Sequence, residues 1–363
     1  MTRLRSLILA AASLVAVAGL AAAQSPVPTA KGKSTTAATP APAAATAAAF
    51  PAPGTKGSPI DGTTFHAQVL LDVAGFPAGV IDGKKGMSFK QALRGFQEAH
   101  DLQVTGQLDQ PTRQALLSQN RESTVMVKLT PDQVAGPFIN PIPKDTAEKA
   151  ALPGLYYRNM LEKLAEAFHT TPETIIALNG PSALIGPGQT LRLPNVAPTA
   201  RNYGNSAKGD VTALMNVLNV SAGDISGTSV VVDKSEGVLK VIGEGDKIVA
   251  QFPVTMGSSH DPLPIGEWKV TTYAFLPPFH YQPDLFWDAK DKGAPDQMLK
   301  PGPNGPVGVA WLDLNKEHYG IHGTPTPETI GRAESHGCIR MTNWDVLRLS
   351  QMLKPGFKAV FQA

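Results

Sequence analysis

The segment that decides the fold runs from Tyr319 to Asp345 and reads YGIHGTPTPETIGRAESHGCIRMTNWD. It contains Cys338, the single cysteine of a 363-residue chain, and two histidines, His322 and His336. A chain with one cysteine cannot form an intrachain disulfide, so the thiol is incidental, intermolecular or reactive. The two nearby histidines favour a reactive thiol, because a cysteine needs a base or a lowered pKa to attack a carbonyl at neutral pH.

Two other interpretations of the lone cysteine are open. A cysteine without further context is most often a small buried hydrophobic residue. Two histidines and a cysteine could also bind zinc, but the chain has neither a Cys-x-x-Cys nor a His-Glu-x-x-His motif. We therefore expect no metal and no cofactor.

The wider sequence settles the choice between these readings. Tyr319–Asp345 resembles the signature of the L,D-transpeptidases with a YkuD-type catalytic domain. The run Pro301–Gly308, followed by Trp311-Leu-Asp-Leu, is similar to the stretch that precedes the histidine in that family. Pro264-Ile-Gly-Glu-Trp268 is similar to its Pro-x-Gly-aromatic segment. The resemblance covers residues 226–363 and implies a mostly β domain that cross-links or edits peptidoglycan in cell-wall biogenesis.

The residues of this segment also predict β structure on their own. β-branched runs broken by turns are typical of a sandwich or barrel, without the alternating helices of a parallel α/β fold. One helix is expected to start at Thr342 or Asn343 under the Cys338 loop, and the long Pro-rich stretch Pro277–Pro306 is either a lid or a variable loop. The expected strands are Ser229–Asp233, Gly237–Ile242, Ile248–Met256 and Trp268–Tyr273.

Chemistry assigns Cys338 as the nucleophile and leaves two candidates for the base that takes its proton. His336 lies two residues away, where an extended strand places both side chains on one face but apart along it. His322 lies on a separate segment and can approach the sulfur from across the site. Gly337 lets the backbone turn tightly, so that successive N–H groups can converge on an oxyanion.

The family resemblance implies a role for each residue of the site. It makes His322 the general base, with its ring oriented by the carbonyl of Gly323, and leaves His336 lining the site. The amides of Gly337 and Cys338 would then stabilise the oxyanion.

Three further residues are predicted to serve the same site. Ser335 is grouped with the orienting residues of the Cys338 loop. Arg340 is a candidate carboxylate clamp because its planar fork suits that group, and a structural salt bridge is the alternative. Tyr319 is a candidate substrate contact.

The first half of the chain predicts two small modules. Residues 61–120 carry three helical patterns, with a capping box at Ser88 and an N-cap at Asp109, and resemble a peptidoglycan-binding domain. Residues 145–196 read as strand, helix, helix, strand and resemble a LysM module, although Arg158-Asn-Met stands where the usual Gly-Asp-Thr opening would be. Residues 198–225 are interpreted as a linker with a possible short helix. The expected fold class is therefore multidomain α+β, with a three-helix bundle, a βααβ LysM-like module and a sandwich-like catalytic domain.

The N-terminus predicts export. Residues 1–23 combine two arginines, an apolar run too short to span a bilayer and an Ala-Ala-Ala cleavage site, as in a signal peptide. Residues 24–60 are an Ala/Pro-rich linker. We therefore expect a periplasmic or cell-envelope protein with no transmembrane segment after cleavage.

The charge of the chain is balanced, with 32 Lys+Arg against 30 Asp+Glu, which argues against nucleic acid as a partner.

The implied reaction is acyl transfer on peptidoglycan stem tetrapeptides. Cys338 would form an acyl-enzyme at the third-residue carbonyl and release D-Ala. An amine from a second stem or from an anchored lipoprotein would resolve it, and water as acceptor would make the enzyme an L,D-carboxypeptidase. A non-catalytic wall-binding protein is the alternative from another class. The two small modules are expected to hold the enzyme on its polymer and to take no part in the chemistry.

Overall fold

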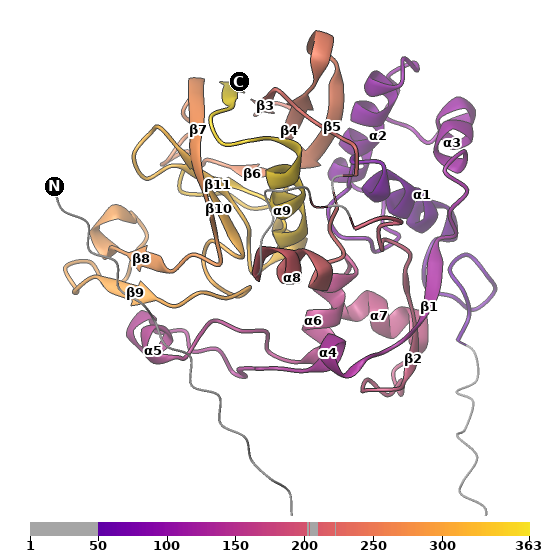
Figure 1. Cartoon of the computed structure of the whole chain (residues 1–363), viewed down its shortest axis with the longest axis horizontal. Helices are drawn as coiled ribbons and strands as arrows, with labels where there is room; N and C mark the ends of the chain where they lie inside the picture. Colours follow the sequence, from indigo (N-terminus) through magenta and orange to yellow (C-terminus); the bar gives the residue numbers. More distant parts are fainter. Residues whose placement is uncertain (1–49, 202, 204–209, 222) are drawn as a thin grey trace, which may run out of the picture. The chain divides into compact units, whose positions relative to one another are not determined.

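Helices occupy the first half of the described chain and a large sheet dominates the second half (Figure 1). The structure is a computed structural model that describes residues 50–201, 203, 210–221 and 223–363. The predicted signal peptide and most of the 24–60 linker lie outside these residues. The described residues belong to one compact unit, and the predicted multidomain α+β class is confirmed within it.

The three-helix module consists of α1 (Gly62–Val73), α2 (Met87–Ala99) and α3 (Gln110–Leu117). Asp109 caps α3 as predicted, because its side chain accepts from the amide of Thr112. The capping box predicted at Ser88 is wrong, since the N-cap lies two residues earlier, at Gly86, and has no side-chain cap. Its apolar face, including Phe89 and Phe96, lies in the core of the bundle.

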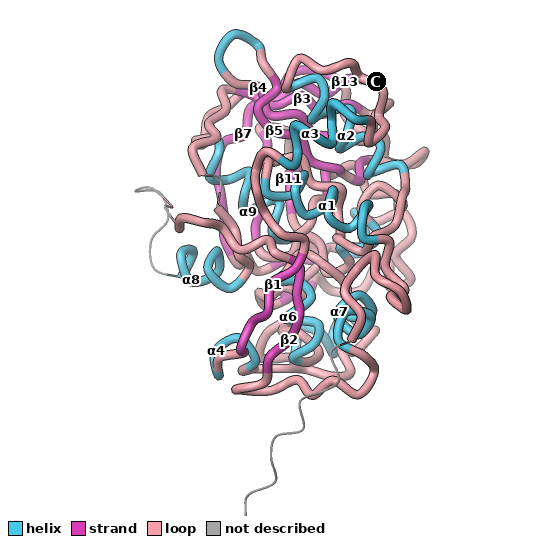
Figure 2. Tube along the Cα trace, turned by 90° about the vertical axis from the view of Figure 1, so that its right-hand side faces the viewer, coloured by secondary structure: helices cyan, strands magenta, loops and turns pink. Residues whose placement is uncertain are grey.

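The middle module begins earlier than the sequence predicted. The strand that pairs with β2 (Thr190–Pro194) is β1 (Thr124–Lys128), in antiparallel register, and the two run side by side in Figure 2. The strand expected near residue 145 is wrong, since α5 (Thr146–Ala151) forms there. The remaining helices are α4 (Pro131–Val134), α6 (Met160–Ala167) and α7 (Pro172–Asn179). The name middle module is used below for residues 124–196.

The segment interpreted as a linker contributes to the core of the catalytic domain. The expected short helix is present as α8 (Asp210–Val217). Met215, Leu218 and Val220 are fully buried in the same hydrophobic cluster as the strands of the large sheet. The linker interpretation is therefore wrong for these residues, because their apolar side chains are removed from water by the domain that follows.

The large sheet has nine strands and carries the candidate site near one end. Two neighbouring pairs, β13–β3 and β11–β12, are parallel, and the other pairs are antiparallel. A separate two-stranded sheet joins β8 (Phe279–Tyr281) and β9 (Gln297–Leu299). The nine strands in order are β5 (Ile248–Pro253), β4 (Val238–Ile242), β3 (Ser229–Asp233), β13 (Lys358–Gln362), β7 (Gly266–Phe275), β10 (Ala310–Leu314), β11 (Gly320–His322), β12 (Ile339–Arg340) and β6 (Thr255–Met256).

Helix α9 (Asn343–Met352) is buried against this sheet. Thr342 is its N-cap, and the Thr342 side chain accepts from the amide of Asp345. The sequence predicted a start at Thr342 or Asn343, and the structure has Thr342 as the N-cap and Asn343 as the first helical residue, shortly after the strand that follows Cys338.

Buried polar contacts join all three parts of the chain. Arg348 of α9 donates to the carbonyl and the carboxylate of Asp72 in α1, at 2.9 and 3.1 Å. The same carboxylate accepts from His169 Nδ1 at 3.0 Å, and the His169 ring stacks on Trp344. Burial alone would raise the pKa of Asp72, but the charges of Arg348 and His169 hold it well below its usual value. The modules are therefore packed on the catalytic domain, and the expected arrangement of three modules on linkers is wrong.

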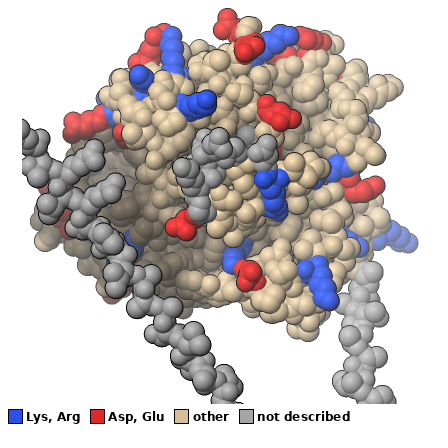
Figure 3. All heavy atoms as spheres, in the orientation of Figure 1, with Lys and Arg blue, Asp and Glu red and all other residues tan. Residues whose placement is uncertain are grey.

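The face in Figure 3 carries basic and acidic side chains interspersed. In the described part of the chain, no helix has the length and apolar character needed to cross a membrane.

Candidate active site

A cavity of about 740 Å³ opens beside the parallel strands β11 and β12. Cys338, His322, His336, Arg340 and Tyr319, all predicted from the sequence, line it together. The remaining three predicted residues, Gly323, Ser335 and Gly337, belong to the backbone turns beside them. The structure therefore brings the whole predicted set into one place.

Parallel pairing of two short strands places the predicted nucleophile and base on neighbouring segments. Ile321 of β11 lies opposite Ile339 of β12, and His322 lies opposite Arg340. Both isoleucines are fully buried, so the core fixes this register. Cys338 directly precedes β12, and its thiol donates a hydrogen bond to the His318 carbonyl at 3.5 Å.

His322 is buried and held in one tautomer. Its Nδ1 lies 2.7 Å from the carbonyl oxygen of Gly323. A carbonyl can only accept, so Nδ1 carries the proton and Nε2 keeps a free lone pair. The ring also stacks on Trp311, with 5.3 Å between ring centroids. An imidazole fixed in this way can take a proton at Nε2.

The electrostatics favour a neutral thiol and a neutral imidazole at rest. Burial lowers the pKa of His322 to about 3; the charge of Arg340 acts in the same direction and the Gly323 hydrogen bond opposes it. Burial raises the pKa of the Cys338 thiol, which outweighs the lowering by a hydrogen bond from the Gly320 backbone and by Arg340. Proton transfer would then accompany attack, as in general-base catalysis, rather than precede it.

Ser335 fixes the loop that carries the nucleophile. Its hydroxyl donates to the Cys338 carbonyl at 2.6 Å and accepts from the Gly257 amide at 2.7 Å. Gly337 has φ +91°, and a Cβ there would lie 2.5 Å from the Tyr319 ring. Only glycine fits this turn, which leaves the amides of the loop available for an oxyanion.

Tyr319 packs beneath the nucleophile loop as well as lining the cavity. Lys316 Nζ lies 4.6 Å from the centre of its ring. Burial raises the pKa of the Tyr319 hydroxyl. The predicted substrate contact is thus also part of the support for Gly337.

His336 and Arg340 line the cavity, and each carries a buried polar atom that has no hydrogen-bond partner among the described residues. These groups are His336 Nδ1 and Arg340 Nε. His336 Nε2 contacts Asp288 at 2.8 Å, and Arg340 Nη1 donates to the Glu334 carbonyl at 3.2 Å. A carboxylate can only accept, so His336 Nε2 donates to Asp288 and Nδ1 of the neutral ring is left as an acceptor, whereas Arg340 Nε is a donor. A buried polar group without a partner is uncommon in proteins, and two of them lie beside Cys338 in this cavity wall.

Two parts of the cavity wall were not identified residue by residue from the sequence. One is the long stretch from Pro277 to Pro306, whose β8–β9 pair and Phe286 side chain cover the site. The length of that stretch was the available signal. The other is α5 of the middle module, which packs on β9 and contributes Thr146 and Lys149. No local pattern in the sequence predicts the contact between α5 and β9.

Among the described residues, no group of three or more His, Cys, Asp or Glu is arranged to hold a metal ion.

The pKa shifts predict how the rate of Cys338 acylation depends on pH. Because His322 stays neutral down to about pH 3, acylation should show no inflection near the ordinary imidazole pKa of about 6.5. The rate should rise at alkaline pH, as the thiol with its raised pKa begins to ionise. Stopped-flow acylation by a carbapenem-type β-lactam from pH 5 to 9 measures this profile. A sigmoid centred near pH 6.5 would show that the imidazole takes up a proton in that range.

Comparisons with known proteins identify two regions of the chain. Residues 227–361 match the L,D-transpeptidase catalytic domain (YkuD), and residues 65–116 match a "Putative peptidoglycan binding domain". The "Putative L,D-transpeptidase YkuD" of Bacillus licheniformis is 35% identical over 113 residues, which are 31% of this chain and 53% of the relative. The chain thus spans about half the length of that relative. The "Putative L,D-transpeptidase YqjB" of Bacillus subtilis is 31% identical over 136 residues, 36% of this chain and 69% of the relative. A solved L,D-transpeptidase structure from Xylanimonas cellulosilytica aligns over 86% of this chain and 97% of its own, with 13% identity and a TM-score of 0.33.

Proposed function

Because the chain belongs to the L,D-transpeptidase family, we propose that it transfers acyl groups between peptidoglycan stem peptides, with Cys338 as the nucleophile. The observation that carries the proposal is the shared cavity of Cys338 and His322, in which Nδ1 of His322 is committed to a carbonyl. A thiol beside a neutral imidazole with a free nitrogen is equipped for acyl transfer.

In the first step the Cys338 sulfur attacks the carbonyl of the third residue of a stem tetrapeptide. His322 Nε2 takes the thiol proton, and the carbon–sulfur bond forms. The oxyanion is stabilised by backbone amides of the loop at Gly337 and Cys338. The carbon–nitrogen bond to D-Ala then breaks, and His322 returns the proton to the leaving amine.

In the second step an amine attacks the thioester and restores the free thiol. A stem-peptide amine would give a 3-3 cross-link, and an amine on a lipoprotein would anchor that protein. Water would give a carboxypeptidase. The Pro277–Pro306 segment and α5 line the open cavity beside Cys338. An acceptor stem bound between them would displace water from the acyl-enzyme, which favours an amine acceptor.

We also place the reaction outside the cytoplasm, in the periplasm or cell envelope. The support is the signal-peptide pattern of residues 1–23 together with a substrate class found in the cell wall. A signal-sequence fusion to a periplasmic reporter would fail to report export if this location were wrong.

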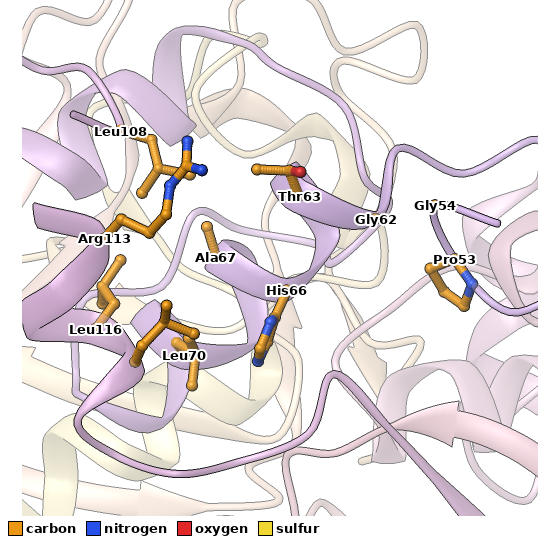
Figure 4. A pocket seen from close by; sticks show the side chains of 11 residues that line it. Pro53, Gly54, Gly62, Thr63, His66, Ala67, Leu70, Leu108, Arg113 and Leu116 are labelled. Carbon is orange, nitrogen blue, oxygen red and sulfur yellow. The ribbon is translucent and has the colours of Figure 1, made fainter. Parts of the chain in front are cut away.

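The three-helix module is proposed to bind peptidoglycan. A second cavity, of about 340 Å³, lies between α1 and α3 and is lined by Thr63, His66 and Arg113 (Figure 4). These polar groups beside apolar Leu70 and Leu116 suit a ligand with sugar and peptide parts. Sedimentation with insoluble sacculi tests the proposal, since Arg113→Ala should leave more protein in the supernatant. The glycan-binding role predicted for residues 145–196 stays a prediction.

Product analysis with purified tetrapeptide muropeptides tests the proposed reaction. We expect mass spectrometry to find released D-Ala and a cross-linked dimer, both absent with Cys338→Ala. Tripeptide with no dimer would favour the carboxypeptidase. Neither product, from folded protein that sediments with sacculi, would favour a non-catalytic wall-binding protein.

A further inference from the structure

A buried carboxyl group of the middle module reaches the start of helix α9 in the catalytic domain. Glu166 of α6 is 6% exposed, and its Oε1 accepts a hydrogen bond of 2.6 Å from Asn343 Nδ2. The two residues are far apart in the sequence and lie in different modules. A buried hydrogen bond to a carboxyl group is among the stronger polar contacts in proteins.

Asn343 uses its remaining polar groups to hold the loop before β10. Its Oδ1 accepts from the Val309 amide at 3.0 Å, and its Nδ2 also donates to the Pro303 carbonyl at 3.2 Å. The side chain is fully buried. Each bond fixes the amide plane further, so the Asn343 side chain has one orientation available.

The same Oδ1 atom lies directly against the backbone of Gly323. A Cβ at Gly323 would be 2.1 Å from Asn343 Oδ1, which leaves no room for a side chain. The carbonyl of Gly323 is the group that accepts from His322 Nδ1 at 2.7 Å. A continuous path of contacts therefore runs from Glu166 through Asn343 and the Gly323 backbone to the general base.

We propose that Glu166 is a positioning residue for His322 and acts through Asn343, so that the middle module fixes the orientation of the catalytic base. The inference rests on the proposed function for the identity of that base. It makes the middle module part of the machinery for acyl transfer, in addition to any role in binding the wall.

The middle module also holds the neighbouring loop by its backbone. The Leu155 amide donates to the Pro301 carbonyl at 3.0 Å, and the Asn304 amide donates to the Leu155 carbonyl at 2.9 Å. A Cβ at Gly302 would lie 2.1 Å from the Leu155 oxygen. The middle module thus holds the residue 301–309 segment directly through Leu155 and indirectly through the Glu166–Asn343 hydrogen bond, which limits movement of Asn343. Burial raises the pKa of Glu166 to about 7, and either protonation state can accept from Asn343.

Three substitutions in the full chain test the role of Glu166 by the rate constant of Cys338 acylation and the apparent substrate affinity, measured separately. Glu166→Leu keeps the volume but removes the acceptor, so we expect the rate constant to fall by about 10- to 100-fold with affinity unchanged. Glu166→Gln keeps an oxygen at the same reach and should stay within about threefold of wild type. Glu166→Asp shortens the side chain by one methylene group, and its acylation rate constant should lie between those of Glu166→Leu and Glu166→Gln.

Gln251→Leu is the matched control. Gln251 of β5 is buried and donates to the Gln91 carbonyl of α2 at 2.7 Å, a contact between modules that does not involve Asn343. It should lower the melting temperature but leave the acylation rate of the folded protein unchanged. A purely structural role for Glu166 predicts the same pattern for Glu166→Leu, so unchanged acylation in that folded variant would overturn the proposal. If Glu166→Leu does not fold, a wild-type rate for Glu166→Asp would overturn it instead.

A readout without substrate separates this proposal from the proposed function. The ¹⁵N shifts of His322 report its tautomer, with the signal assigned from His322→Gln. We expect wild type and Glu166→Gln to carry the proton on Nδ1 and Glu166→Leu to show a mixture of tautomers. If Glu166→Leu carried the His322 proton on Nδ1 as fully as wild type does, the positioning role would be contradicted even in an active enzyme. A normal pattern in a protein that is not acylated would leave positioning supported and refute the proposed function.

Discussion

Replacement of Cys338 by alanine is expected to reduce acyl transfer to background, a loss of at least about ten-thousand-fold. Cys338 is the single cysteine of the chain and lines the same cavity as His322. Because Cys338 forms no disulfide and its thiol makes one weak hydrogen bond, the free energy of unfolding should change by less than about 1 kcal/mol. Turnover of muropeptides and thermal melting of the same preparation measure both effects. Residual turnover above a few per cent would exclude Cys338 as the nucleophile.

Alanine variants of the two histidines test which of them is the general base. His322→Ala should slow acylation by about 10²- to 10⁴-fold, the usual effect of losing a general base. His336→Ala should cost less, since its ring contacts Asp288 and serves the cavity wall. A larger loss with His336→Ala would show that the base has been assigned to the wrong histidine.

Removal of residues 1–225 is expected to prevent the catalytic domain from folding. Three fully buried residues of its core, Met215, Leu218 and Val220, would be lost. Arg348, which is buried, would lose Asp72 and keep only Asp345, whose carboxylate lies 3.7 Å away. A domain has only about 5–15 kcal/mol of stability in total. The shortened chain therefore lacks both part of its core and one of the two carboxylate partners of a buried cation.

Circular dichroism during heating distinguishes the outcomes. A chain that starts at residue 50 should unfold cooperatively near the temperature of the full protein, whereas one that starts at residue 226 should show no cooperative transition. A cooperative transition at the full-length temperature in the shorter chain would show that the modules add little to stability. The contacts of Arg348 and Asn343 would then be incidental.

Local features of the fold could be predicted from the sequence because they depend on local chemistry. Asp109 was recognisable as an N-cap from its place before a helical pattern, and Thr342 likewise. Cys338 and His322 were recognisable because their motif is continuous along the chain. Ser88 was misread since Gly86 starts the helix without any side-chain signal.

Contacts between modules could not be predicted in this way. Asp72 and Arg348 are separated by 276 residues, and neither residue type indicates a buried partner when read alone. Glu166 lies in a helix whose charged residues would ordinarily face solvent. Apolar periodicity identifies the buried face of each element, but it does not say which buried polar groups will meet. The Glu166–Asn343 contact is therefore visible only in the folded structure.

Intact-protein mass spectrometry of the full chain incubated with a purified stem tetrapeptide tests the central claim most directly. The account predicts a mass increase equal to the tetrapeptide donor minus D-Ala, located on Cys338 by peptide mapping and absent from Cys338→Ala. An adduct that persists in Cys338→Ala, or product formation by way of an acyl group on another residue, would contradict it.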